Sequence, residues 1–207
     1  MQLFDPDGLA PLLKKEEFAN KDIRFRQYDF NPGKLAAEDR PKAAQEALGR
    51  FREDHQTALK NARTIGIDKE EMLWELIRYA RLEAYTDRPS SYYELNLEYR
   101  GLFADAAKAG VNLGAMRGLK EKWAPNHKGT PTGTGEYEPR GQKEVNELVQ
   151  VVLSHRWDDD ERQFKTRIHD KCRIGPATDL IGQEFSGLDF PTLMLLLYPD
   201  ADPADFG

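Results

Sequence analysis

The chain has 207 residues, of which 39% are hydrophobic and 32% are charged, a balance typical of a globular protein and not of a disordered one. Its longest apolar run, 193–198, is far too short to cross a bilayer, and its first residues lack the features of a signal peptide. A single cysteine, Cys172, excludes an internal disulfide framework and fits a reducing compartment. We therefore expect a cytoplasmic protein, inside a host cell if it is viral, with no membrane partner.

The negative charge is concentrated at the C-terminus. The chain has 30 Lys and Arg against 36 Asp and Glu, a net charge of -6. Residues 176–207 contain acidic residues but no Lys or Arg, and they carry the whole excess. Such an acidic, aromatic-rich end can dock on a protein partner. In the alternative interpretation, 193–198 packs on the core and only the acidic tail 199–207 is loose.

The N-terminal half predicts an arm followed by helices. Residues 1–34 are irregular and include the turn sequence Asn31-Pro32-Gly33. Apolar residues at steps of three and four predict a helix over 35–65, with Pro41 in its first turn. Asp68 with Glu71 is typical of a helix start, and Ser91 with Glu94 predicts another helix that ends near Gly110.

The C-terminal half predicts a linker and further helices. Residues 124–141 are rich in Gly, Pro and Thr and read as a flexible connection. Apolar spacing predicts helices over 145–153 and 158–173, the second with acidic residues in its first turn and basic residues later, as the helix dipole favours. No segment alternates strictly enough to predict a strand with confidence.

These observations predict an all-α protein. It is a helical bundle with a possible helix-turn-helix, a Gly/Pro/Thr-rich linker and a smaller C-terminal helical segment. The expected divisions are an N-terminal arm (1–34), a helical domain (35–123), a linker (124–141), a C-terminal helical segment (142–198) and an acidic tail (199–207).

One segment has a motif-like pattern. Residues 102–123 read LFADAAKAGVNLGAMRGLKEKW, which resembles the helix-turn-helix of DNA-binding proteins. Ala106 and Gly110 occupy the positions of the small residue and of the turn glycine, which needs a backbone angle that glycine adopts easily. Met116 and Leu119 then fall on the inward side of the second helix.

The resemblance implies contacts with duplex DNA. The second helix would expose Asn112, Arg117, Lys120 and Lys122, with Lys128 nearby; arginine reads guanine edges or phosphates and lysine contacts phosphates. Residues 108–128 are locally basic within an otherwise neutral body. The expected function is a non-enzymatic DNA-binding regulator, or a viral packaging factor similar in architecture to small terminase subunits, acting as a homo-oligomer.

Other interpretations of this segment stay open. It can be a plain helical hairpin packed in a core, or Gly110, Gly114 and Gly118 can form a smooth groove for another helix. The alternative function is then a structural or adaptor protein of a larger assembly, such as a virion component, that binds neighbouring subunits through its terminal arms.

No catalytic constellation stands out, so we expect a protein that is not an enzyme. The acidic run 158–161 suits a helix start better than a metal, because adjacent helical positions point in different directions. His169 and Cys172 have a zinc-like spacing but lack further cysteines. Residues 128–135 lack the Gly-Lys-Ser/Thr of a phosphate loop. We expect no metal and no cofactor.

Overall fold

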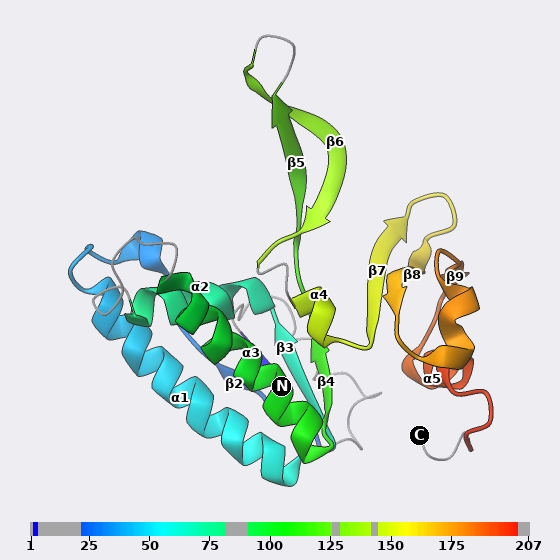
Figure 1. The fold of residues 1–207 in the computed structure, drawn as a ribbon, viewed down its shortest axis with the longest axis horizontal. Coiled ribbons are helices and arrows are strands. Elements are labelled where there is room, and N and C mark those ends of the chain that lie inside the picture. Colours follow the sequence, from blue (N-terminus) through cyan, green and yellow to red (C-terminus); the bar gives the residue numbers. More distant parts are fainter. Residues whose placement is uncertain (1, 4–21, 82–90, 126–128, 142–144, 203–207) are drawn as a thin grey trace. The chain divides into compact units, whose positions relative to one another are not determined.

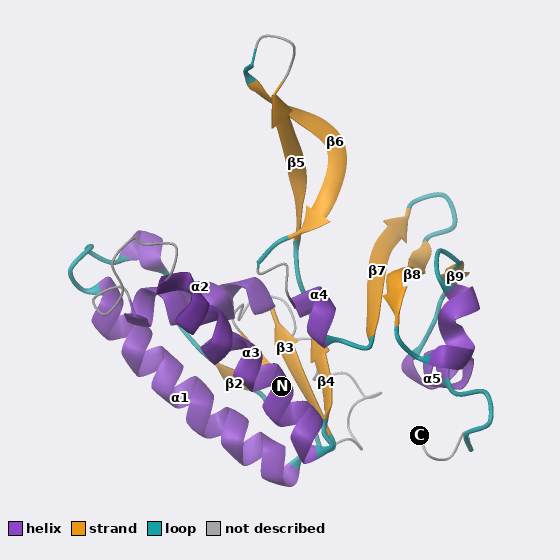
Figure 2. Cartoon of the chain, viewed as in Figure 1, coloured by secondary structure: helices purple, strands orange, loops and turns teal. Residues whose placement is uncertain are grey.

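The structure, a computed structural model, describes residues 2–3, 22–81, 91–125, 129–141 and 145–202. It divides into two compact units, Met1–Lys143 (unit 1) and Glu144–Gly207 (unit 2). Both contain strands as well as helices (Figures 1 and 2). The prediction of an all-α fold is therefore wrong, and the protein is a mixed α/β protein. None of the described helices is both long and apolar enough to cross a membrane.

Unit 1 is built on a parallel sheet. Its strands stand in the order β2-β1-β3-β4, and each neighbouring pair is parallel. Ile65 and Ile67 on β3 are buried and point to the same face, as alternation along a strand requires. The strands are β1 (Gln2–Leu3), β2 (Arg26–Gln27), β3 (Thr64–Asp68) and β4 (Asn112–Ala115).

Three helices that pack on one another accompany this sheet (Figure 1). Three helices form between the arm and Gly110, as expected, with Pro41 in the first turn of the first one. The first ends at Asn61 and not at residue 65, because Thr64 and Ile65 belong to β3. Their buried stripes include Phe51, Leu76 and Tyr99. The helices are α1 (Arg40–Asn61), α2 (Glu70–Arg81) and α3 (Ser91–Ala109), preceded by the short helix η3 (Pro32–Lys34).

The second helix of the expected helix-turn-helix is absent from the described residues 110–125. Gly110 does end α3 with a positive φ of 69°, as the turn glycine should. The chain then enters β4, where Leu113 pairs with Ile65. Pairing with a buried strand outweighs the weak helix propensity of a segment that contains Gly114 and Gly118. Residues 102–115 therefore form a helix, a turn and a strand, and the predictions of a helix-turn-helix and of a plain helical hairpin are both wrong.

A long hairpin follows where the linker was expected. It consists of β5 (Leu119–Pro125) and β6 (Pro131–Pro139), which pair antiparallel with a register shift between Glu121 and Trp123. Thr132, Thr134 and Tyr137 suit an extended strand despite the glycines beside the threonines. The prediction of a flexible linker over 124–141 is wrong for the described part of that segment.

Unit 2 is a three-stranded antiparallel sheet with short helices. The strand order is β7-β8-β9, and a small core contains Ile168, Cys172, Ala177 and Leu197. The predicted helix over 145–153 is right only for 145–148, because β7 begins at Val151, and the predicted helix over 158–173 is wrong, because that segment forms the end of β7, a turn and β8. The described part of the segment 142–198 is therefore not helical throughout. The elements are α4 (Val145–Leu148), β7 (Val151–Asp158), β8 (Gln163–Cys172), η4 (Gly175–Leu180), β9 (Glu184–Ser186) and α5 (Phe190–Leu197).

The apolar part of the C-terminal end packs in this core. The Asp189 carboxylate accepts a hydrogen bond from the Thr192 amide at 2.8 Å and so caps α5. Leu197 is buried, and Leu193 and Met194 pack beside it. Of the two interpretations of 193–198, packing on the core is the one the structure supports. Residues 203–207 of the expected acidic tail lie outside the described residues.

His55 gives unit 1 a defined pH dependence. It is fully buried on α1, its Nε2 lies 3.3 Å from the Leu102 carbonyl, and burial lowers its pKa below 6.5 despite the raising effects of Leu102 and Asp105. The folded state thus binds this proton less tightly than the unfolded chain. We expect the free energy of unfolding to fall as the pH drops below 6.5. Hydrogen exchange of unit 1 peptides, followed as denaturant is added at a series of pH values, should show a shallower acid slope in His55→Gln; an unchanged slope contradicts this.

Candidate ligand site at the carboxyl ends of the parallel strands

The carboxyl ends of β3 and β4 are joined to the start of α2 by backbone hydrogen bonds. The Met116 amide donates to the Ile67 carbonyl at 2.8 Å, and the Glu70 amide donates to the Met116 carbonyl at 2.9 Å. β3 ends at Asp68, a half-buried residue that pairs with Leu3 of β1. Lys69 then turns the chain into α2 with a positive φ of 51°, a conformation that non-glycine residues adopt infrequently.

A buried ion pair lies at the carboxyl ends of β3 and β4. The Arg117 guanidinium donates through Nε to the Glu70 carboxylate. The Glu70 side chain is 0% exposed and the Arg117 side chain 9%. Burial raises the pKa of Glu70 to about 7, against the opposing effect of Arg117. The other carboxylate oxygen, Glu70 Oε1, is buried and has no hydrogen-bond partner in the structure, so α2 begins with an incompletely satisfied acidic group.

Glu71 continues the contact between α2 and the hairpin. Its Oε1 lies 3.4 Å from the Gly118 amide, which donates to it, and its Oε2 is buried without a hydrogen-bond partner. On the returning leg of the hairpin, the Arg140 amide donates to the Gly118 carbonyl at 2.9 Å. Gly141 has a φ of 82°, and a Cβ there would lie 3.0 Å from Glu71 Cβ. Both legs of the hairpin therefore meet the first turn of α2.

The strand order makes this edge a topological switch point. From β1 the chain goes to β2 on one side and then to β3 on the other. In open parallel sheets, ligands bind outside the carboxyl ends of the strands at the point where the direction reverses. Here that point lies between β1 and β3, and Asp68 ends β3 there.

The residues expected to contact DNA do not share one surface. Arg117 is buried in its ion pair with Glu70. Lys120 lies 3.2 Å from the Glu138 carboxylate and Lys122 lies 3.0 Å from the Glu136 carboxylate, both on the hairpin. Asn112 is exposed at the opposite end of β4 from Arg117, and Lys128 lies outside the described residues.

The two faces of the hairpin differ in chemistry. Side chains alternate along a strand, so Lys120 and Lys122 share one face with their carboxylate partners. Tyr137 pairs with Glu121 across the strands and lies on the other face. Trp123 and Tyr137 are 66% and 63% exposed. The hairpin therefore exposes two large aromatic side chains, and on one face its lysine charges are matched by glutamates.

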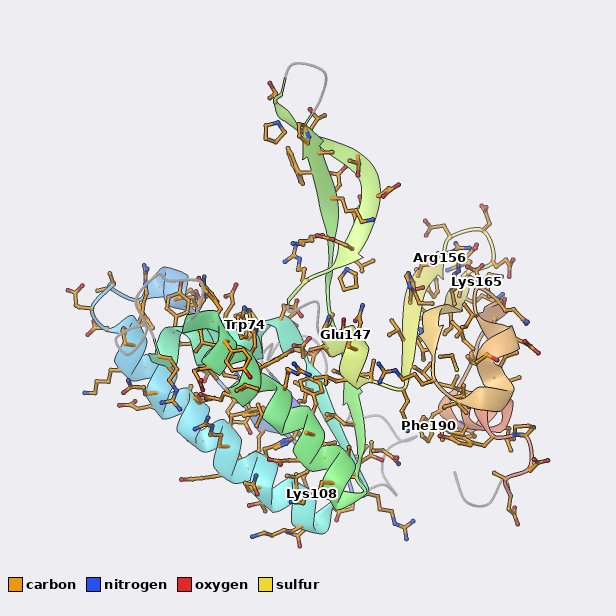
Figure 3. The ribbon with its side chains drawn as sticks, viewed as in Figure 1. Trp74, Lys108, Glu147, Arg156, Lys165 and Phe190 are labelled. Atoms are coloured by element: carbon orange, nitrogen blue, oxygen red, sulfur yellow. The ribbon has the colours of Figure 1, made fainter. Side chains whose placement is uncertain are left out.

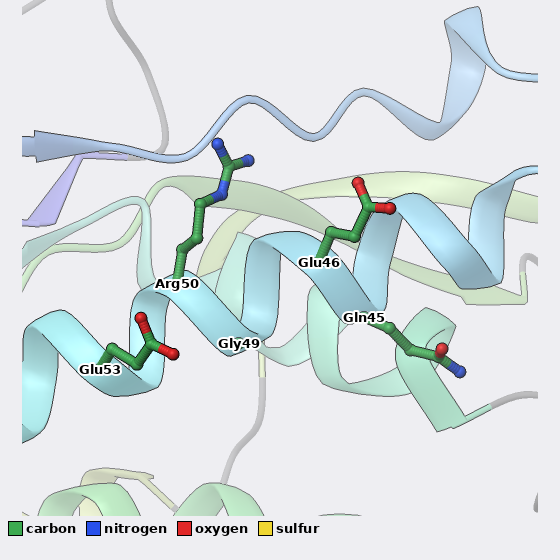
Figure 4. A pocket seen from close by; sticks show the side chains of 5 residues that line it. All are labelled: Gln45, Glu46, Gly49, Arg50 and Glu53. Atoms are coloured by element: carbon green, nitrogen blue, oxygen red, sulfur yellow. The ribbon is translucent and has the colours of Figure 1, made fainter.

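Other candidate features are weaker. A shallow hollow on α1 is lined by Gln45, Glu46, Gly49, Arg50 and Glu53 (Figure 4), all exposed residues with no buried polar group among them. In unit 2, Arg156 and Lys165 lie opposite each other on β7 and β8 (Figure 3), within a surface network of ion pairs. Within the described part of the chain, no three His, Cys, Asp or Glu residues are grouped as metal ligands.

Sequence reasoning missed the roles of Asp68 and Glu70. The sequence pattern predicts a helix cap at Asp68, whereas Asp68 is the last residue of β3 and the helix begins at Glu70. The signal that could have found it is the alternation of Ile65 and Ile67 before an aspartate, which is typical of a half-buried strand and would have placed Asp68 at its carboxyl end. No local signal marks Glu70 as buried.

The fold and this edge define an α/β protein with an open parallel sheet. Comparison of the chain with protein-family models, curated proteins and solved structures finds no match. The function is therefore argued from the geometry alone.

Proposed function

We propose that unit 1 binds a nucleotide as its magnesium complex at the carboxyl ends of β1 and β3. The observation that carries the proposal is the parallel strand order β2-β1-β3-β4, with its switch point between β1 and β3 and Asp68 at the end of β3. Open parallel sheets with such a reversal bind ligands at that position, nucleotides among them.

The chemistry of the edge is consistent with this ligand. Mg²⁺ is held in phosphate complexes by one or two carboxylates together with phosphate oxygens and water, and Asp68 supplies a carboxylate. Magnesium bound in this way needs only one carboxylate from the protein. The proposal is therefore compatible with the finding that the described residues contain no group of three metal-ligating side chains. Lys69 has a left-handed backbone conformation and turns the chain from β3 into α2 directly after Asp68. Residues in such sparsely populated backbone conformations cluster at functional sites.

The proposal predicts that Asp68→Asn abolishes most of the magnesium-dependent affinity. The amide keeps the size of the side chain but loses the charge that the cation needs. We expect the dissociation constant for ATP in the presence of Mg²⁺ to rise by about 10- to 100-fold, the loss typical of one charged contact. Isothermal titration calorimetry with ATP, with and without Mg²⁺, measures it.

Asp105→Asn is the matched control, because Asp105 is an exposed aspartate on α3 and the change is chemically identical. It should bind ATP with Mg²⁺ as the unchanged protein does. The proposal fails if the unchanged protein does not bind ATP with Mg²⁺, or if Asp68→Asn binds it equally well.

Binding of duplex DNA stays a prediction. The helix-turn-helix on which it was based is absent from the described residues, and the three described basic residues assigned to DNA are engaged by Glu70, Glu136 and Glu138. The adaptor function also stays a prediction, because no contact of the described residues bears on it.

A further inference from the structure

We propose that the first turn of α2 couples the ligand site at the end of β3 to the β5–β6 hairpin, so that a ligand at Asp68 changes the order of the hairpin. This inference rests on the proposed function for the identity of the ligand. Its structural basis is the set of contacts that Glu70 and Glu71 make with both legs of the hairpin.

The hairpin depends on its attachment at the base. β5 and β6 make their principal contacts with each other, and an isolated two-stranded hairpin is only marginally stable in water. Trp123 and Tyr137 remain largely exposed, so no buried core stabilises the outer part. A small change in how the base is held can therefore shift the balance between the ordered and the opened hairpin.

The base is held by a short and continuous set of contacts. On the outgoing leg, Met116 accepts from the Glu70 amide, Arg117 pairs with the Glu70 carboxylate, and the Gly118 amide donates to Glu71. On the returning leg, the Arg140 amide donates to the Gly118 carbonyl, so the two legs are tied together beside α2.

Gly141 makes the closest approach of the returning leg to the helix. A Cβ at this position would lie 3.0 Å from Glu71 Cβ and 3.1 Å from Glu71 Cα, closer than side chains normally pack. Only two residues separate Asp68 from Glu71 in sequence. A ligand that fixes Asp68 and the turn at Lys69 therefore fixes the surface against which Gly141 packs.

Gly141→Ala is the variant that tests the coupling, and Gly135→Ala is its matched control. Both glycines have a positive φ, 82° at Gly141 and 74° at Gly135, so both substitutions introduce a similar backbone strain. A Cβ at Gly135 has nothing within 4 Å. The two variants thus differ in whether the added methyl group meets α2.

Hydrogen–deuterium exchange of the full chain, with and without ATP and Mg²⁺, reads out the coupling. In the unchanged protein, the ligand should slow amide exchange over 119–125 and 131–139 several-fold. Gly141→Ala should bind the ligand, as calorimetry checks, but show no such slowing, while Gly135→Ala should keep it. If ATP with Mg²⁺ binds to the protein without substitutions but does not slow amide exchange in its hairpin, the coupling is overturned and the proposed function still stands.

The ligand-free protein tests the coupling separately from nucleotide binding. Without ligand, Gly141→Ala should accelerate exchange of the hairpin legs and also of residues 70–73, whereas Gly135→Ala should affect the hairpin alone. If Gly141→Ala proves unfolded by circular dichroism, Glu71→Ala serves in its place, with Glu75→Ala one turn later on α2 as its control. Acceleration confined to the immediate neighbours of the substituted residue overturns the inference even if ATP does not bind.

Discussion

Arg117→Met is expected to lower the free energy of unfolding of unit 1 by about 3–5 kcal/mol, because it leaves the fully buried Glu70 carboxylate without its charged partner. Burial already raises the pKa of Glu70 to about 7 with Arg117 present. Removal of the guanidinium takes away the largest effect that opposes this rise. Hydrogen exchange of peptides from α1, α2 and α3, followed as denaturant is added, measures the loss in unit 1.

Two further variants separate the ion pair from a simple change of packing. Lys122→Met removes a cation from an exposed pair with Glu136, and such pairs contribute only about 0–1 kcal/mol. The double variant Glu70→Leu with Arg117→Met removes both charges and should recover most of the lost stability. If the single Arg117→Met variant is as stable as Lys122→Met, the buried pair does not have the role that its burial indicates.

The helices of unit 1 were predictable because their signals are local. The spacing of Ala44, Leu48, Phe51 and His55 on α1 repeats at steps of three and four, and all these residues are buried. A helix forms its backbone hydrogen bonds within one segment, so one segment of sequence contains the whole pattern. The same reasoning identified the start of α3 and its end at Gly110.

The strands were missed for two different physical reasons. In β8, Phe164, Ile168 and Cys172 are four apart, a spacing that places residues on one face of a helix and equally on one face of a strand. The intervening Lys165, Thr166 and Arg167 are all polar, so the sequence does not separate the two, although Thr166 is buried and Arg167 exposed in the strand. β3 and β4 are short, and their partners are distant in sequence, with Thr64 opposite Asn112; no local pattern reveals such a pairing.

The candidate site could not be predicted for a related reason. Glu70 and Arg117 come together only because β3 and β4 are neighbours in the sheet. In sequence, Arg117 belongs to a basic segment and resembles a surface cation that contacts phosphate. Its burial follows from the strand register, which places it just beyond the end of β4 and beside the start of α2.

Phe51→Ala is expected to lower the stability of unit 1 by about 3–5 kcal/mol. Phe51 is fully buried on α1; its ring meets Tyr28 edge-on at 5.3 Å and stacks on His55 at 5.6 Å. Removal of the ring loses both contacts and leaves a cavity. Ile168→Ala is the counterpart in unit 2, where Ile168 is fully buried in a separate small core, and its cost should be about 2–5 kcal/mol.

Because the two cores share no residue, each substitution should move only the unfolding of its own unit. Two-state behaviour does not hold for chains with separate domains, so unfolding is best followed by hydrogen exchange of peptides from each unit. Phe51→Ala should raise exchange in α1, α2 and α3 and leave β7 and β8 unchanged, and Ile168→Ala should do the reverse. A loss of protection in both units from either substitution would contradict the independence of the two cores and would mean that the units unfold as one.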